Sequence, residues 1–282
     1  MMIKKITVMG MIALGVLGTS CSSDDGPATA TMELDTFGLE ELTDGSRYQG
    51  WLVSDGEVIP TTKFTNADEQ IFTFEASKLE AATEFILTIE QASDNNNTPS
   101  DTRILKGTFS GNAATLSFEE AVTSFTGNAG TFEMATPTDN DETNEASGIW
   151  FTESTQGLTL NTLRAGWKYE AWAVVNGTPI SMGTFTDPSG PDEFNSSSST
   201  INAAPQYPGE DFLNNNVAPT GLVFPLDLRG ATISISVEPF PDEDRAPFFL
   251  TPLTGTIQST DAPGDLLLMS VNSAIPQGQV VR

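Results

Sequence analysis

Carboxylates are the only abundant side chains in this sequence that could support acid–base chemistry or bind a metal ion. The chain has 38 Asp and Glu residues, no His and one Cys. Without His, a Ser–His–Asp or Cys–His arrangement is impossible, and zinc sites of the usual His/Cys kind are excluded. Paired carboxylates could hydrolyse a glycoside, and Glu90 and Glu238 occupy equivalent positions of an internal repeat. A duplicated Glu at a strand end is more often a hydrogen-bonded structural residue, so we expect no enzymatic activity and no cofactor.

Two acidic stretches offer hard oxygen ligands, for which calcium is the plausible ion. Asp139 and Asp141 lie in the first stretch, and Asp242 and Asp244 lie in the second. Neither stretch has the Gly-containing spacing of a calcium-binding loop. We therefore predict no metal site and interpret both stretches as solvated loops, with calcium binding as the alternative.

Two aromatic residues in a long polar segment are candidates for ligand contact. Tyr207 and Phe212 lie among Pro, Gly and Asn residues, and exposed aromatics on a long loop can contact a ligand. The alternative, which we favour, is that both rings anchor the loop to the body of the protein.

The charge of the chain argues against nucleic acid as a partner. The formal net charge is −26, with only 12 Lys and Arg residues, and a strongly acidic surface repels nucleic acid and anionic headgroups. Apolar residues make up 38% of the chain, enough to bury a core.

The N-terminus has the pattern of a secretory signal peptide. Lys4 and Lys5 precede a short apolar run over 6–18, which is too short for a normal spanning helix. The single cysteine, Cys21, ends the segment "LGTSC", which resembles the lipobox of bacterial lipoproteins, where this cysteine is acylated. We predict a signal peptide over 1–20, a lipidated tether over 21–27 and anchoring to a membrane through the acyl chains; an ordinary signal peptide with a chance cysteine is the alternative.

The residues after Cys21 indicate where in the cell envelope the protein is located. Ser22 follows Cys21 directly and an acidic pair comes next. This order favours the outer membrane and is compatible with exposure on the cell surface.

The rest of the chain is a tandem duplication. Nine residues between Leu39 and Thr65 have an identical partner 121 positions later, and five between Glu90 and Thr108 have one 148 positions later. The offset grows by 148 − 121 = 27 residues, so the second copy carries an insertion. We predict copies over 28–136 and 148–282, with the insertion near 187–219. The acidic segment 137–147 joins them as a linker or, as we slightly favour from the alternation on both sides, as the loop of a hairpin.

Local patterns indicate β-structure throughout. "FILTIE" (85–90) and "TISISVE" (232–238) alternate at period two, as half-buried strands do. The Asp-Gly of "SDG" and the Asn-Gly of "VNG" are type I′ turn signals, which predict hairpins over 48–64 and 169–185. Only "SKLEAAT" (77–83) suggests a short helix. We therefore expect an all-β protein of two tandem antiparallel β-sandwich modules after the lipoprotein signal peptide.

An aromatic pair occurs in both copies. Tyr169 precedes Trp172 by three residues in "GWKYEAWAVVNG", as Tyr48 precedes Trp51. At period two the members of each pair face opposite sides of the sheet. We expect one ring to enter the core, and we predict that this ring is the tryptophan.

The aligned segments resemble the C-terminal, extracytoplasmic domain of anti-sigma-K factors. The resemblance rests on "LNTLRAGWKYEAW", "MGTF", "SISVEPFP" and "PFFLTPLTGTI" in the second copy, and on "LEELTDGSRYQGW", "TKF", "LTIEQ" and "PSDTRILKGTF" in the first. The first copy departs from the pattern at Lys63 and Gln91. The resemblance implies a β-sandwich module exposed outside the cytoplasm. Cys21 stands where that family has its sigma-binding domain and membrane helix, so sigma-factor binding does not carry over.

Together these observations predict a non-catalytic cell-envelope lipoprotein that binds a protein or an envelope component. The alternative is a glycan-binding or glycan-active surface lipoprotein. The unduplicated segments, 187–219 and 136–147, are where we expect the ligand to bind.

Overall fold

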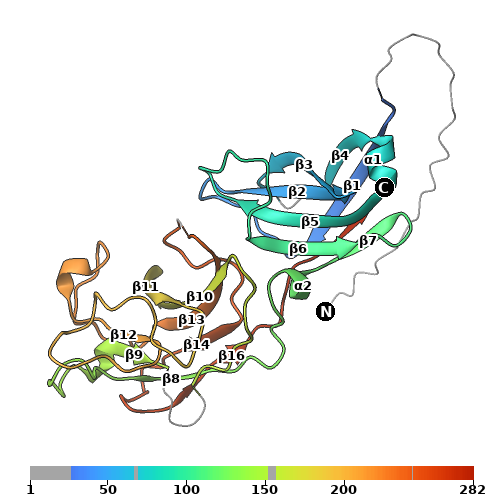
Figure 1. Ribbon diagram of the computed structural model, residues 1–282. Coiled ribbons are helices and arrows are strands. Elements are labelled where there is room, and N and C mark those ends of the chain that lie inside the picture. Colours follow the sequence, from blue (N-terminus) through green and yellow to red (C-terminus); the bar gives the residue numbers. More distant parts are fainter. Residues whose placement is uncertain (1–26, 67–68, 152–156, 243) are drawn as a thin grey trace, which may run out of the picture.

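The computed structural model describes residues 27–282, except 67–68, 152–156 and 243. This part of the chain is all-β, with antiparallel sheets and only short helices, as predicted. The strands form two modules that meet end to end (Figure 1). None of the helices described here is long and apolar enough to cross a bilayer. The predicted signal peptide and the acylated Cys21 lie outside the described residues.

The first module is one eight-stranded sheet that curls around its core and is nearly closed. In order across the sheet its strands are β3 (Glu57–Phe64), β2 (Arg47–Ser54), β5 (Ala82–Glu90), β6 (Arg103–Thr108), β7 (Ala113–Ser117), β17 (Gln277–Val281), β1 (Thr29–Phe37) and β4 (Gln70–Glu75). Helix α1 (Ala76–Glu80) follows β4 and overlaps the segment predicted to be helical, and α2 (Phe118–Ala121) follows β7.

The second module contains a five-stranded and a four-stranded sheet. The first has the order β11 (Thr178–Phe185), β10 (Trp167–Val175), β13 (Thr232–Pro239), β14 (Leu253–Thr256) and β16 (Ser270–Val271). The second has the order β12 (Gly209–Asp211), β9 (Gly148–Trp150), β8 (Thr131–Met134) and β15 (Leu267–Leu268). Two short 3₁₀ helices, η1 (Glu145–Ser147) and η2 (Asn215–Val217), lie in its loops.

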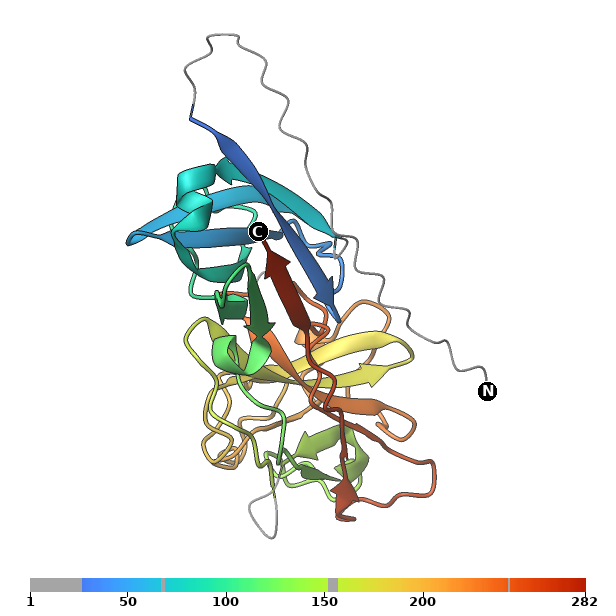
Figure 2. The same ribbon diagram turned by 90° about the vertical axis from the view of Figure 1, so that its right-hand side faces the viewer.

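The two modules exchange one strand. β8 closes the first sequence copy, yet it pairs with β9 and β15 of the second module. β17 closes the second copy, yet it lies between β1 and β7 of the first module (Figure 2). The offset of 148 places residues 131–134 opposite 279–282, so β8 and β17 are the same element of the two copies. The sequence copies are therefore not the folding units, because each module is completed by the last strand of the other copy.

Both predicted hairpins are confirmed. Val53 pairs with Val58 in β2–β3, and Val174 pairs with Pro179 in β10–β11. The turn residues have the positive φ values that a type I′ turn needs, 52° at Asp55 and 51° at Asn176, each followed by a glycine with φ near 80°.

The segment between the copies is the loop of a hairpin. Met134 of β8 pairs with Ile149 of β9, and the N–H of Ala135 donates to the Gly148 carbonyl at 3.3 Å. The favoured hairpin is thus confirmed, and it lies wholly within the second module.

Both members of each aromatic pair are buried. Tyr48, Trp51 and Tyr169 are fully buried, and Trp172 is 2% exposed. The expected burial of the tryptophans is confirmed, but the expectation that only one ring of each pair would enter the interior is wrong. The tyrosines join the main hydrophobic cluster, and the tryptophans lie on the other sheet face, where they meet buried polar groups.

The junction between the modules is tightly packed. The indole N–H of Trp167 donates to the Arg103 carbonyl at 3.0 Å. Gly166 has φ +84°, and a Cβ there would lie 2.4 Å from the Asp101 backbone, so this position tolerates only glycine. One hydrophobic cluster runs through both modules, which fixes their relative placement.

Candidate binding site between the modules

A buried hydrogen-bond network recurs in the two copies. In the first, the Trp51 indole N–H donates to the Thr88 hydroxyl at 2.8 Å. Thr88 donates to Glu90 Oε1, and the Ser100 N–H donates to the same oxygen at 3.1 Å. Glu90 therefore holds the β5–β6 loop against the end of its strand.

The second copy repeats the network with equivalent residues. Trp172 donates to the Ser236 hydroxyl at 2.8 Å, Ser236 donates to Glu238 Oε1, and the Phe248 N–H donates to that oxygen at 2.8 Å. Both duplicated Glu residues are thus hydrogen-bonded, as the sequence predicted.

The loops held by these two glutamates differ at the junction. The first copy has Ser100 and Asp101 where the second has Phe248 and Phe249, at an offset of 148. The two phenylalanine rings contact each other with their centroids 4.3 Å apart, and Phe248 also packs on Trp167 at 6.1 Å. Only the second copy thus places an aromatic pair between the modules.

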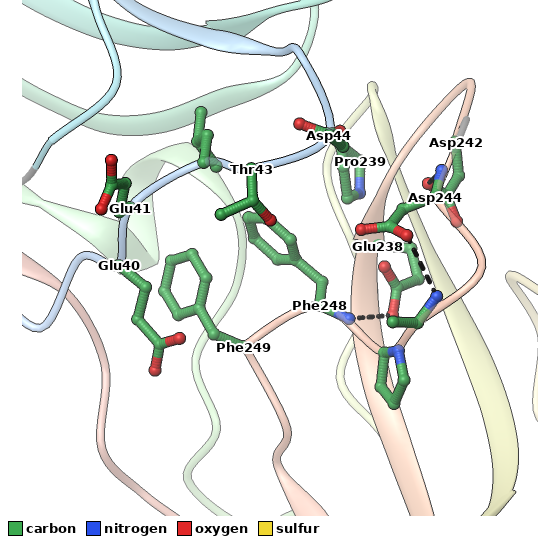
Figure 3. Close-up of a pocket in the computed structure, with 13 residues that line it drawn as sticks. Glu40, Glu41, Thr43, Asp44, Glu238, Pro239, Asp242, Asp244, Phe248 and Phe249 are labelled. Atoms are coloured by element: carbon green, nitrogen blue, oxygen red, sulfur yellow. Dashed lines mark hydrogen bonds between the residues drawn. The ribbon is translucent and has the colours of Figure 1, made fainter. Parts of the chain in front are cut away.

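These rings wall a pocket of about 110 Å³ that residues of both modules line (Figure 3). The first module contributes Glu40, Glu41, Leu42, Thr43 and Asp44, and the second contributes Glu238, Pro239, Asp242, Asp244, Ala246, Pro247, Phe248 and Phe249. Figure 3 shows Phe248 and Phe249 between the glutamates of the first module and the carboxylates of the second.

The segment from the first module is held by its backbone and its leucines. The Tyr48 hydroxyl donates to the Glu40 carbonyl at 2.8 Å, and the Leu42 N–H donates to the Thr65 carbonyl at 3.1 Å. Leu42 is 7% exposed, while Glu40 and Glu41 are exposed. The apolar side chains thus fix the segment, and the acidic side chains extend towards the pocket.

The pocket is strongly acidic. Six of the lining residues are Asp or Glu, and none is Lys or Arg. Burial raises the pKa of Glu238 to about 8, and the nearby carboxylates of Asp242 and Glu170 act in the same direction. Burial also raises the pKa of Glu170 to about 7, and the charge of Glu170 acts on Glu238. Such shifts arise where a carboxyl is desolvated among like charges, so a positive charge placed here would relieve the repulsion.

No protein-family model, no curated protein and no solved structure matches this chain. The resemblance to the anti-sigma-K domain therefore stays a prediction, and the site has to be judged on its own geometry.

The insertion is packed onto the second module. Its strand β12 pairs with β9, and fully buried Asp211 accepts hydrogen bonds from the Thr138 N–H at 2.9 Å and from the Trp150 indole at 2.6 Å. Phe212 is fully buried against Phe224, at 5.4 Å between centroids. Tyr207 is partly buried and lies edge-to-face on Trp150 at 6.1 Å. Both candidate ligand contacts thus anchor the insertion, which was the favoured interpretation.

Two further acids belong to the insertion itself. Burial raises the pKa of Glu210 to about 8 and that of Asp192 to about 6, and the charge of Asp192 adds to the shift of Glu210. Asp192 accepts hydrogen bonds from the N–H groups of Gly209 and Phe194 at 2.9 and 2.8 Å. These contacts hold the ends of the insertion together.

The calcium candidates cap turns. Asp139 Oδ1 accepts from the Asp141 N–H at 3.0 Å, and Asp242 Oδ1 accepts from the Asp244 N–H at 2.9 Å. In the part of the chain that the structure describes, no group of three or more His, Cys, Asp or Glu residues could hold a metal ion.

The junction pocket lies outside the segments in which the sequence predicted ligand binding. Asp242 and Asp244 were singled out, but for calcium, and Glu40, Phe248 and Phe249 were missed. A signal for the phenylalanines was present: "PFF" in the second copy stands where the first has "PSD". The two copies share the residues around this position but differ in two aromatic side chains, which indicates that the position has a different role in each copy.

Proposed function

We propose that the protein is a non-catalytic binding protein of the cell envelope, which holds a protein or an envelope component at the junction of its two modules. The observation that supports this most is the pocket itself, because it is lined by acidic residues of both modules and contains the aromatic pair that distinguishes the second copy. Concave sites at module interfaces are common places for ligands.

The test is site-specific photo-crosslinking in the full chain in its native host. A photoreactive residue at Glu41, which lines the pocket, should give a discrete crosslinked product. The matched control is Glu33, an exposed acid of β1 that does not line the pocket. The same products from both positions, or none from Glu41, would exclude binding at the junction.

Anchoring at the outer membrane through Cys21 belongs to the same proposal. It is supported by the apolar run over 6–18 and by the position of the single cysteine after it. Metabolic labelling with an alkyne fatty acid should mark the protein, and Cys21→Ser should abolish the label. Protease treatment of intact cells would then show whether the modules face outwards.

Glycan binding is the second candidate, because aromatic rings beside carboxylates also suit sugars. Phe248 and Phe249 next to Glu238 are the observation in its favour. A polysaccharide array separates the outcomes: retention of the protein on a glycan indicates a binding module, and release of sugar indicates an enzyme. If neither is observed, the ligand is a protein or an envelope component.

A further inference from the structure

The proposed function rests on the junction pocket, and the residues that line this pocket indicate which chemical group it binds. Its acidic residues come from both modules and surround two aromatic faces. Arg245 lies in the same loop but does not line the pocket. The described residues that line the pocket thus include carboxylates but no Lys or Arg.

Glu238 places a carboxyl oxygen in the pocket that a ligand can bind. It is 1% exposed and lines the pocket. The hydrogen bonds that it accepts from Ser236 and Phe248 both end on Oε1. Its raised pKa keeps a proton on the carboxyl when no cation is near, and a positive charge close by favours the ionised form. A cation in the pocket can therefore take the place of this proton and donate to Oε2.

The size and walls of the pocket limit what this donor can be. The volume of about 110 Å³ is smaller than the roughly 150 Å³ of a cavity that holds one benzene ring, so the pocket suits the end of a side chain better than a sugar ring with its hydroxyls. The phenylalanine faces are electron-rich and attract cations. A phospholipid headgroup is disfavoured, because its phosphate would meet the carboxylates of Glu40, Asp44 and Asp244.

We infer that the junction pocket binds a basic side chain of a protein partner, arginine in preference to lysine. The flat guanidinium can lie on the Phe249 ring while its N–H groups donate to carboxylates on both sides. An ammonium satisfies the charge but presents no flat face. The two modules thus contribute opposite walls of one cation site, with Glu40 on one wall and Glu238 and Asp244 on the other.

The experiment uses the full chain and four small probes: the N-acetyl methylamides of arginine, lysine, citrulline and norleucine. Citrulline is the neutral counterpart of arginine, and norleucine that of lysine. Binding is followed by NMR chemical shifts of the phenylalanine rings, at physiological salt. We expect arginine to bind more tightly than lysine, and both neutral probes to bind at least tenfold more weakly than their charged counterparts.

Two variants test the two kinds of contact. Glu40→Gln with Asp244→Asn removes one charge from each wall but keeps the amide oxygens that can accept hydrogen bonds, and should weaken arginine binding about tenfold. Phe249→Leu keeps an apolar wall but loses the aromatic face, and should weaken it roughly 3- to 30-fold, the range of a cation–π interaction. The control, Glu33→Gln with Asp35→Asn, removes two exposed charges elsewhere and should change affinity less than twofold. Melting temperatures check that each variant folds.

Four results would overturn the inference. Equal binding of citrulline and arginine would show that charge is not recognised. Equal weakening by the control pair would show that only the overall charge matters. No binding by any probe, together with crosslinks from position 41, would overturn the cation site but leave the proposed function standing. No probe binding and no crosslinks would overturn both.

Discussion

Replacing Glu238 by Gln should make the protein less sensitive to alkaline pH. Glu238 is 1% exposed and its pKa is raised by burial to about 8, against 4.5 for a free glutamate. The folded protein therefore keeps a proton on this carboxyl that the unfolded chain releases. Since the folded state binds more protons between these two pH values, its stability falls as pH rises from about 4.5 to about 8, and it is constant above that.

The magnitude follows from the two pKa values. A difference of about 3.5 pKa units at about 1.4 kcal/mol each gives at most roughly 5 kcal/mol. About 4 kcal/mol of this is lost between pH 5 and pH 9. For a chain of this size 1 kcal/mol corresponds to about 2 °C in melting temperature, so Glu238 accounts for up to about 8 °C over that range. Glu170 and Glu210, whose pKa values burial also raises, add losses of the same sign.

The assay is the melting temperature of wild type and Glu238→Gln from pH 5 to pH 9. Gln keeps an oxygen that can accept the bonds from Ser236 and Phe248, so the two proteins should be similar at pH 5. The variant should then lose several degrees less than wild type on going to pH 9. Glu33→Gln, at an exposed position, should follow wild type. A variant that loses as much stability as wild type would refute the claim that Glu238 carries a proton in the folded state.

Three other predictions concern the fold. Trp172→Phe removes the donor to Ser236 in a buried network and should cost about 1–3 kcal/mol, measured by urea unfolding. Asp211→Ala removes the acceptor of the Trp150 indole and should destabilise the insertion by about 3 kcal/mol or more, seen as faster hydrogen exchange there. Deletion of residues 277–282 should remove exchange protection from the amides of β1 and β7 that bond to β17, while β10 and β13 keep theirs.

Each of these predictions has a control or a contrary outcome. If the free energy of unfolding of Trp172→Phe equalled that of wild type, the hydrogen bond from the indole to the Ser236 hydroxyl would not contribute to stability. For the insertion, Asp211→Asn should lose less stability than Asp211→Ala because it keeps one acceptor oxygen. For the deletion, the exposed substitution Gln279→Ala should leave protection intact, and protection of β1 and β7 in the truncated chain would refute their dependence on β17.

Local features of the fold were predictable from the sequence because single turns encode them. The Asp-Gly and Asn-Gly pairs fix the register of two hairpins, and alternation on both sides of 136–147 was enough to favour the third. The fully buried tyrosines were harder, because a single strand does not reveal whether its second face will be covered. Tyr48 and Trp51 occupy opposite faces, and here both faces are buried.

The strand exchange and the pocket could not be predicted. The repeat shows that residues 131–134 and 279–282 are equivalent, and for that reason it cannot say which module each completes. The pocket joins Glu40 to Phe249, residues about 200 positions apart that meet only once the modules are docked. Asp242 and Asp244 were visible as acids, but their neighbours decide what those acids can bind.

The position of β17 bears on how the chain is produced. β17 is five residues long, is the last of the described strands to be synthesised and completes the sheet that contains β1. While residues 118–276 are being synthesised, at about 5–20 residues per second, β1 and β7 wait roughly 10–30 s with one edge each unpaired. Unpaired edges invite pairing with other chains, so the nascent protein passes through a vulnerable interval that an ordinary tandem repeat would avoid. A chain cut short after β7 would remain in that state.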